Sequence, residues 1–292
     1  MKAKRLIEVA MPIKEISAES TRDKRVNHGH VSTVHLWWAR RPLPACRAVV
    51  FASLVPDPLD ENCPKAFIEA VDDMLLKNIA YKPYRDIPYT ASTDIMEDNR
   101  RNRLLMFIGK FTERCQSDMI LGKATPPSDQ VTVSSLIKWE AKNDPQVIGI
   151  AQKLIWVAYN SELDSSKTYI SLSTDFNTYK SAIKKAEDKL YSLHDRHLET
   201  ERVTMAEMEL SSAIEAFTSK MPAVFDPFSG GGAIPLEAAR LGCRSYGNDI
   251  NPVAHIVEKG SAEFPQRYGK PIVYSLDEFN KLYGKEGKAI LE

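Results

Sequence analysis

The residues best suited to ligand chemistry lie between positions 224 and 251, in the run VFDPFSGGGAIPLEAARLGCRSYGNDIN. A short apolar run ends in Asp226, glycines follow at positions 230–232, and a second run ends near Asp249. Because glycine has no Cβ, a ligand can lie directly against backbone N–H groups at a helix N-terminus. A carboxylate that ends the second strand can accept hydrogen bonds from both ribose hydroxyls. The pattern predicts a strand, a glycine loop, a helix and a second strand that bind a nucleoside; the alternative is an ordinary glycine turn.

The details of the loop distinguish between nucleoside ligands. A dinucleotide-binding loop has the pattern GxGxxG, in which the third glycine allows the helix to pack closely on the sheet. Here Gly230 and Gly232 are followed by Pro235, where the third glycine is expected. The carboxylate of Asp226 would repel a pyrophosphate, whereas it suits the cationic head group of an amino acid. A nicotinamide cofactor is therefore disfavoured.

The run Asp-Pro-Phe-x-Gly-x-Gly at 226–232 resembles the cofactor loop of S-adenosylmethionine-dependent methyltransferases that modify exocyclic amino groups of DNA bases. The resemblance implies that S-adenosyl-L-methionine is the cofactor and that Asp226 and the glycine amides hold its methionine end. It also implies that Phe228 packs on the cofactor and that Asp249 binds the ribose. The cofactor-binding residues expected from it are Asp226, Pro227, Phe228, Gly230, Gly232, Asp249 and Asn251.

A second informative stretch, HGHVSTVHLWWARRPL, spans residues 28–43. It is similar to the N-terminal signature of a prokaryotic family of adenine-specific DNA methylases that begin with a domain of unknown function. The resemblance covers residues 5–56 and 221–259, and matches more weakly around the Lys-Trp-Glu run at 138–140. It implies that this chain corresponds to the N-terminal part of such a methylase.

The N-terminal stretch also has the charge and the aromatic residues of a nucleic-acid contact. Residues 1–50 carry ten Lys and Arg against four acids, a net charge of +6 in a chain whose net charge is zero. Arg40 and Arg41 have planar guanidinium groups suited to phosphate, although an ion pair that seats this segment is the alternative. Trp38 could stack on a base, or could serve as core. We predict that these three residues contact DNA, and a solvated basic face remains the alternative.

Metal binding and membrane insertion are not indicated. The three histidines between positions 28 and 35 lack helical i, i+4 spacing and a nearby thiol, so we expect hydrogen bonding in a loop and no metal site. The four cysteines are scattered without a CxxC pair, which favours reduced, buried thiols in a cytoplasmic protein. No apolar run approaches the roughly 18 residues that a membrane span needs, and the N-terminus does not have the pattern of a secretory signal.

The predicted fold class is α/β, a partial Rossmann-like class I methyltransferase sheet with a large helical insert. We expect a signature segment at 1–56 that packs on the methylase domain, a helical insert at 57–220, and a partial S-adenosylmethionine-binding domain at 221–292. Within the insert, periodicity predicts helices after Pro64, from Pro145 and over 179–193. Asp94 with Glu97, and Thr204 with Glu207, are predicted helix caps, and residues 271–274 are a predicted third strand.

The motif that would perform catalysis is missing from the sequence. Amino methyltransferases localise the amine lone pair with a D/N/S-P-P-Y/F/W loop, whose acceptors bind the amine hydrogens and whose aromatic ring stacks on the flipped base. The Pro-Pro pair here, Pro126-Pro127, has neither the acceptor nor the aromatic ring. We therefore expect no catalytic residue in this chain, which would act with a C-terminal partner or a missing C-terminal half that carries the loop. The alternative is a non-catalytic, nucleic-acid-binding adaptor subunit that keeps the methyltransferase fold.

Overall fold

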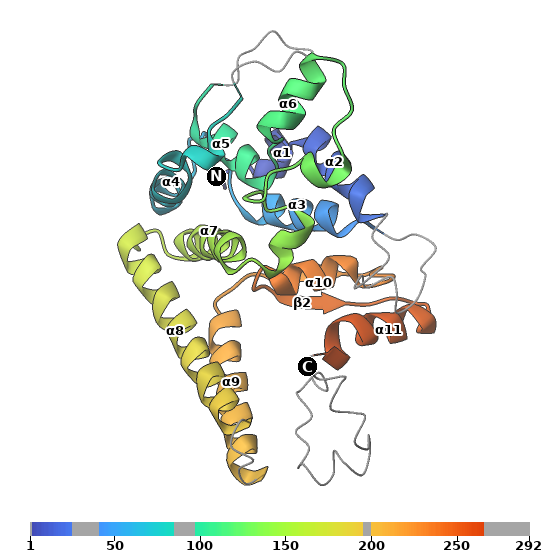
Figure 1. Cartoon of the computed structure of the whole chain (residues 1–292). Helices are drawn as coiled ribbons and strands as arrows, with labels where there is room; N and C mark the ends of the chain where they lie inside the picture. Colours follow the sequence, from blue (N-terminus) through green and yellow to red (C-terminus); the bar gives the residue numbers. More distant parts are fainter. Residues whose placement is uncertain (1, 25–40, 85–96, 195–199, 266–292) are drawn as a thin grey trace. The chain divides into compact units, whose positions relative to one another are not determined.

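The computed structural model describes residues 2–24, 41–84, 97–194 and 200–265 (Figure 1). The structure is mostly helical, at 66%, and its described residues form one sheet of two parallel strands. The predicted fold class, an α/β fold with a partial Rossmann-like methyltransferase sheet and a helical insert, is therefore wrong. The glycine motif correctly predicts one strand–helix–strand unit, but a local motif contains no information about how many further strands pair beside it. The predicted third strand at 271–274 lies outside the described residues.

The α-helices of the described chain are α1 (Leu6–Val9), α2 (Ile13–Asp23), α3 (Leu43–Leu54), α4 (Lys65–Val71), α5 (Arg100–Ile108), α6 (Glu113–Ile120), α7 (Pro145–Leu163), α8 (Tyr169–His194), α9 (Thr200–Thr218), α10 (Ala233–Arg240) and α11 (Pro252–Glu258). Short π- or 3-10-helical turns are η2 (Asp72–Leu76), η3 (Ile79–Tyr81), η4 (Pro127–Asp129), η5 (Trp139–Asn143) and η6 (Lys259–Glu263). The strands are β1 (Ala223–Asp226) and β2 (Arg244–Gly247).

The helices predicted from periodicity after Pro64, from Pro145 and over 179–193 are confirmed as α4, α7 and part of α8. The two predicted caps are wrong. Helix α5 begins after Asn99, whose side-chain oxygen accepts the N–H of Asn102 at 2.9 Å, while Asp94 lies outside the described residues. Thr204 lies inside α9, so its spacing from Glu207 does not mark a helix start.

The chain forms two compact units. One comprises Met1–Phe176 and Thr218–Glu263, and the other comprises Asn177–Phe217 and Phe264–Glu292. The division into three segments that the sequence suggests stays a prediction. Both predicted site regions, where the structure describes them, fall in the first unit.

The core of the first unit is built by α3, α4, α5 and α7. Phe107 of α5 lies at its centre, with ring centroids 5.5 Å from Phe51 of α3 and 5.4 Å from Tyr81, both in edge-to-face contact. Helix α7 can enter this core because Asp144 caps its N-terminus, accepting the N–H of Gln146 at 2.8 Å. Burial of these large rings stabilises the scaffold on which the later strands rest.

The strand–helix–strand unit follows α9 in the chain. β1 and β2 pair in parallel, with Phe225 opposite Tyr246 and Asp226 opposite Gly247, and α10 provides the crossover that parallel strands require. The hydroxyl of Ser245 donates to the carbonyl of Pro235 in α10 at 2.6 Å. Since successive strand residues face opposite sides, α10 covers the side that carries Ser245. Phe225 and Tyr246 lie on the other side and are 63% and 52% exposed, so the sheet has an open aromatic face.

The second unit contains most of α8 and α9, which are long antiparallel helices. Lys189 forms an ion pair with Glu209 across them, and the ammonium of Lys180 lies 5.4 Å from the ring centroid of Phe217. Buried Ile183 and Ala186 of α8 provide apolar contact at helical spacing. This unit contains none of the predicted site residues that the structure describes.

Candidate functional site

Asp226 ends β1 and organises the loop that follows it. One oxygen of its carboxylate accepts the backbone N–H of Phe228 at 3.0 Å, and its carbonyl accepts the N–H of Asn248 at 2.9 Å. The first bond shapes the turn through Pro227, and the second joins the loops after β1 and β2. The Phe228 side chain is 80% exposed, so it is free to pack on a ligand.

Gly230 and Gly232 adopt conformations that favour glycine. Their φ angles are +53° and +76°, in the left-handed region that other residues rarely adopt. Gly232 is the N-cap residue of α10, and a Cβ at this position would lie 3.1 Å from Cγ of Glu258. The predicted glycine loop at a helix N-terminus is therefore confirmed as a local structure.

Asp249 lies against the glycine loop. Its carboxylate accepts the backbone N–H of Gly230 at 2.8 Å and that of Asn251 at 2.9 Å. These bonds to Asn251 and Gly230 lower the pKa of the Asp249 carboxyl, so it is ionised at neutral pH. Asn251 in turn caps α11, accepting the N–H of Val253 at 2.9 Å. The structure thus brings together residues that the sequence places 19 positions apart.

Asp226 is the last residue of β1, and the other six predicted cofactor-binding residues lie in the loops that follow β1 and β2. All seven are thus at the carboxyl ends of the two strands, the edge at which parallel sheets bind ligands. Of the predicted nucleic-acid contacts, Arg41 is exposed at the start of α3, while Trp38 and Arg40 lie outside the described residues. The three N-terminal histidines, at positions 28, 30 and 35, also lie outside the described residues. Among the residues that the structure does describe, no group of His, Cys, Asp and Glu is placed to hold a metal ion.

Sequence reasoning missed two residues at this edge, Ser229 and Glu258. The hydroxyl of Ser229 is buried and donates to Oε2 of Glu258 at 3.0 Å. A Cβ on Gly247, the last residue of β2, would lie 1.5 Å from Oε1 of Glu258. Gly247 is thus the one sequence signal for this contact, since only a residue without a side chain leaves room for that carboxylate.

A buried ion pair fixes the helix that carries the glycine loop. Nε of Arg47 in α3 donates to Glu237 of α10 at 2.5 Å, and the two side chains are 1% and 0% exposed. The same guanidinium donates to the carbonyls of Leu136 at 2.8 Å and Lys138 at 3.2 Å. Arg240 provides a second cation for Glu237. Helix α10 is therefore held on α3 by an ion pair that is shielded from water.

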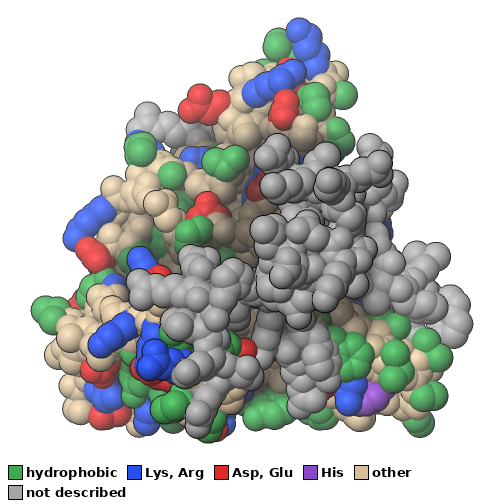
Figure 2. All heavy atoms as spheres, turned by 60° about the horizontal axis from the view of Figure 1, so that its bottom comes forward, with side chains coloured by type: hydrophobic (Ala, Val, Ile, Leu, Met, Phe, Trp, Pro, Cys, Tyr) green, Lys and Arg blue, Asp and Glu red, His purple; other side chains and the backbone are tan. Residues whose placement is uncertain are grey.

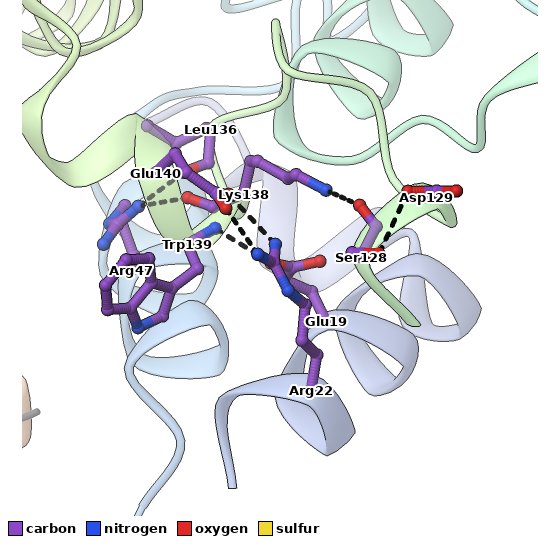
Figure 3. Close-up of polar contacts among 9 residues, drawn as sticks. All are labelled: Glu19, Arg22, Arg47, Ser128, Asp129, Leu136, Lys138, Trp139 and Glu140. Carbon is purple, nitrogen blue, oxygen red and sulfur yellow. Dashed lines mark hydrogen bonds and ion pairs between the residues drawn. The ribbon is translucent and has the colours of Figure 1, made fainter. Parts of the chain in front are cut away.

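The segment that Arg47 contacts is itself anchored to α2, as Figure 3 shows. Glu19 accepts the N–H of Trp139 and an N–H of Arg22, each at 2.9 Å, and Arg22 also pairs with Glu140. Burial raises the pKa of Glu19 despite these bonds. The Lys-Trp-Glu run at 138–140 therefore joins α2 to α3 and, through Arg47, to α10.

Other surface features lie elsewhere. A pocket of about 530 Å³ is lined in part by Lys2, Lys65 and Lys167, and includes none of the predicted site residues. All four cysteines are buried thiols, as predicted, and burial raises the pKa of Cys243 to about 12. Across the described part of the chain, no helix is both long and apolar enough to cross a membrane.

Comparison with known proteins identifies one region. Residues 10–76 match the model of a family described as a protein of unknown function (DUF1156). The matched region includes α2, α3, α4 and η2 and ends well before the glycine loop. No curated protein and no solved structure matches the chain. Residues 10–76 are thus similar to a family whose function is unknown, and the glycine loop is interpreted from its own geometry.

Proposed function

We propose that this chain is the S-adenosylmethionine-binding part of an adenine-specific (amino) DNA methyltransferase. The observation that carries the proposal is the pairing of the two loops, in which Asp249 accepts the N–H of Gly230 at 2.8 Å. This contact places a carboxylate beside a glycine loop at the start of a helix. A nucleoside with an amino-acid head group suits such an edge, because the ribose meets a carboxylate and the head group meets backbone N–H groups.

The residues around the loop favour this ligand over a dinucleotide. Asp226 opens the loop, and a carboxylate there would repel a pyrophosphate. Pro235 occupies the position of the third glycine and is buried in α10, where its carbonyl accepts the hydroxyl of Ser245. These two features, the Asp226 carboxylate and Pro235, disfavour a nicotinamide cofactor.

The proposed substrate is DNA, and the support for it is the N-terminal sequence. The +6 charge of residues 1–50 suits phosphate, and Arg41 is exposed. The resemblance of residues 28–43 to an adenine-specific methylase family favours an exocyclic amine as the methyl acceptor. Adenine N6 and cytosine N4 are both such amines, and the methylase resemblance favours the first.

Methyl transfer requires a catalytic loop that this sequence does not contain, so we propose that a second polypeptide segment supplies it. The open face of the sheet supports a partner, because Phe225 and Tyr246 present aromatic surface there. Figure 2 shows further hydrophobic side chains at the surface of the face that it displays. The second candidate function is a non-catalytic, nucleic-acid-binding adaptor, which the absence of the D/N/S-P-P-Y loop favours.

Calorimetry with S-adenosylmethionine, S-adenosylhomocysteine and NAD tests the binding proposal. The wild-type chain should bind the first two, and Gly232→Val should abolish binding, because its side chain would meet Glu258 and strain the positive φ of the loop. Gly122→Val is the matched control, because Gly122 also has a positive φ, +66°, but has nothing within 4 Å of its Cβ position. Tight binding of NAD without binding of S-adenosylmethionine would contradict the proposal.

Methyl transfer from labelled cofactor to unmodified DNA separates the two candidate functions. The chain alone should transfer no methyl group, and adding a polypeptide that carries an Asp-Pro-Pro-Tyr loop and pairs with this chain should restore transfer. If the chain binds DNA but no added polypeptide with this loop restores methyl transfer, the result would favour the adaptor function.

A further inference from the structure

Glu258 is the residue at the ligand edge whose position the sequence pattern does not explain. It ends α11, and its carboxylate lies between the loops after β1 and β2. Oε2 accepts the Ser229 hydroxyl at 3.0 Å, and Cγ lies 3.1 Å from the Cβ position of Gly232. Oε1 occupies the space that a side chain at Gly247 would need. Gly247 at the end of β2 and Gly232 at the N-cap of α10 therefore admit this one carboxylate to the edge where a ligand would bind.

The Glu258 carboxylate has no compensating cation among the described residues. None of the ion pairs in the described part of the chain includes it, and its neighbour Lys259 lies 3.8 Å from Glu263 instead. Among the described residues, the side-chain donor to this carboxylate is the neutral hydroxyl of Ser229. Asp226 and Asp249, the two carboxylates nearby in the loops, likewise accept backbone N–H groups. Among the described residues, no Lys or Arg forms an ion pair with any of these three carboxylates.

We infer that Glu258 determines the charge specificity of this site, and that it selects a nucleoside ligand carrying a positive charge over a neutral one. This inference rests on the proposed function and refines it. S-adenosylmethionine carries an ammonium and a sulfonium, whereas 5′-methylthioadenosine shares its adenosine and sulfur but has no cation. A carboxylate at the edge favours the first ligand by direct attraction, and a ligand without a cation gains nothing from it.

The test compares the dissociation constants of these two ligands for the full chain and for Glu258→Gln. Glutamine keeps the shape and can still accept the Ser229 hydroxyl, so it removes charge without removing that contact. The affinity for S-adenosylmethionine should fall about tenfold, as expected for a lost charge-assisted bond. The affinity for 5′-methylthioadenosine should change less than about twofold, since the cation is the only group that Glu258 selects. Glu61→Gln, which changes the net charge equally on an exposed turn, should alter neither constant.

S-adenosylhomocysteine then identifies which cation is selected, because it keeps the ammonium and lacks the sulfonium. An equal loss with this ligand assigns the ammonium, and no loss assigns the sulfonium. Glu258→Gln changing all three affinities by the same factor, or tightening them, would overturn the inference and leave the proposed function intact. Failure of the wild-type chain to bind S-adenosylmethionine would instead overturn the proposed function itself.

Discussion

Replacing Arg47 by alanine should destabilise the protein by about 3–5 kcal/mol, the usual result of removing one partner of a buried ion pair. The change leaves the carboxylate of Glu237 in an interior where it is 0% exposed, with Arg240 as its remaining cation. It also removes the donor that the carbonyls of Leu136 and Lys138 share. The Lys138 carbonyl keeps the N–H of Ala141 at 3.0 Å, so only the Leu136 carbonyl loses its described donor, at a cost of about 1–3 kcal/mol. Arg240 offsets part of the charge penalty of Glu237, so we expect the total to stay near the stated range.

The assay is urea unfolding of Arg47→Ala, Glu237→Ala and the double variant, with amide hydrogen exchange of α10 as a local measure. The sum of the two single losses of unfolding free energy should exceed the loss in the double variant by at least about 2 kcal/mol. The reason is that the second change removes the charge that the first change leaves without its partner. Arg47→Met with Glu237→Leu should recover most of the loss, since apolar residues need no partner. Arg114→Ala is the control, because this guanidinium is 63% exposed and its pairs are worth about 1 kcal/mol at most.

Two results would refute this reasoning. The first is additivity of the two single changes, which would mean that Arg47 and Glu237 do not depend on each other. The second is faster exchange throughout the first unit with no preference for α10, which would mean that the pair stabilises the core in general and does not specifically hold this helix.

Three further predictions concern the ligand edge, the N-terminus and the core. Asp249→Ala should weaken S-adenosylmethionine binding severalfold in calorimetry, and an unchanged constant would remove Asp249 from the site. Arg40→Ala/Arg41→Ala should weaken DNA binding and make the slope of log K against log salt shallower by about 1–2, whereas lost stability at constant slope would make these arginines structural. Burial raises the pKa of Glu15 above its ordinary value of 4.5, so its ionisation opposes folding and the stability it confers is lost as pH rises through the folded pKa. Glu15→Gln should therefore raise Tm at pH 8 and should lose this advantage below about pH 4.5; a lower Tm at pH 8 would show that the contact with Tyr84 requires the charge.

The parts of the structure that could be predicted from sequence are those set by neighbouring residues. Glycines at 230 and 232 permit the positive φ angles that the loop adopts, and Pro145 together with Asp144 starts α7. Asp249 meets Gly230 because two parallel strands joined by one helix end at the same edge. In the first two cases a few adjacent residues determine the geometry, and in the third a single strand–helix–strand unit does.

The parts that could not be predicted depend on contacts between distant residues. Arg47 and Glu237 are 190 positions apart, and neither helix pattern marks its charged residue as buried. In the sequence Glu258 has no feature that distinguishes it from other helical glutamates, and its role depends on the folded contacts with Gly247 and Ser229. The predicted sheet failed for the same reason, because strand pairing beyond β1 and β2 depends on long-range contacts that the glycine motif does not encode.

These distant contacts decide how the matched N-terminal region relates to the glycine loop. Glu19 and Arg22 of α2 fix the segment around Trp139, and Arg47 of α3 joins that segment to Glu237 of α10. Both helices lie within residues 10–76, the part with a family match. Since α10 begins at the glycine loop, the buried face that holds this loop in place is supplied by the matched region. A two-stranded sheet is marginally stable by itself, so the packing of α10 on α3 supports the loop in addition to the local bonds of Asp226 and Asp249. The region at 10–76 therefore supports, through α2 and α3, the helix at whose N-terminus the glycine loop lies.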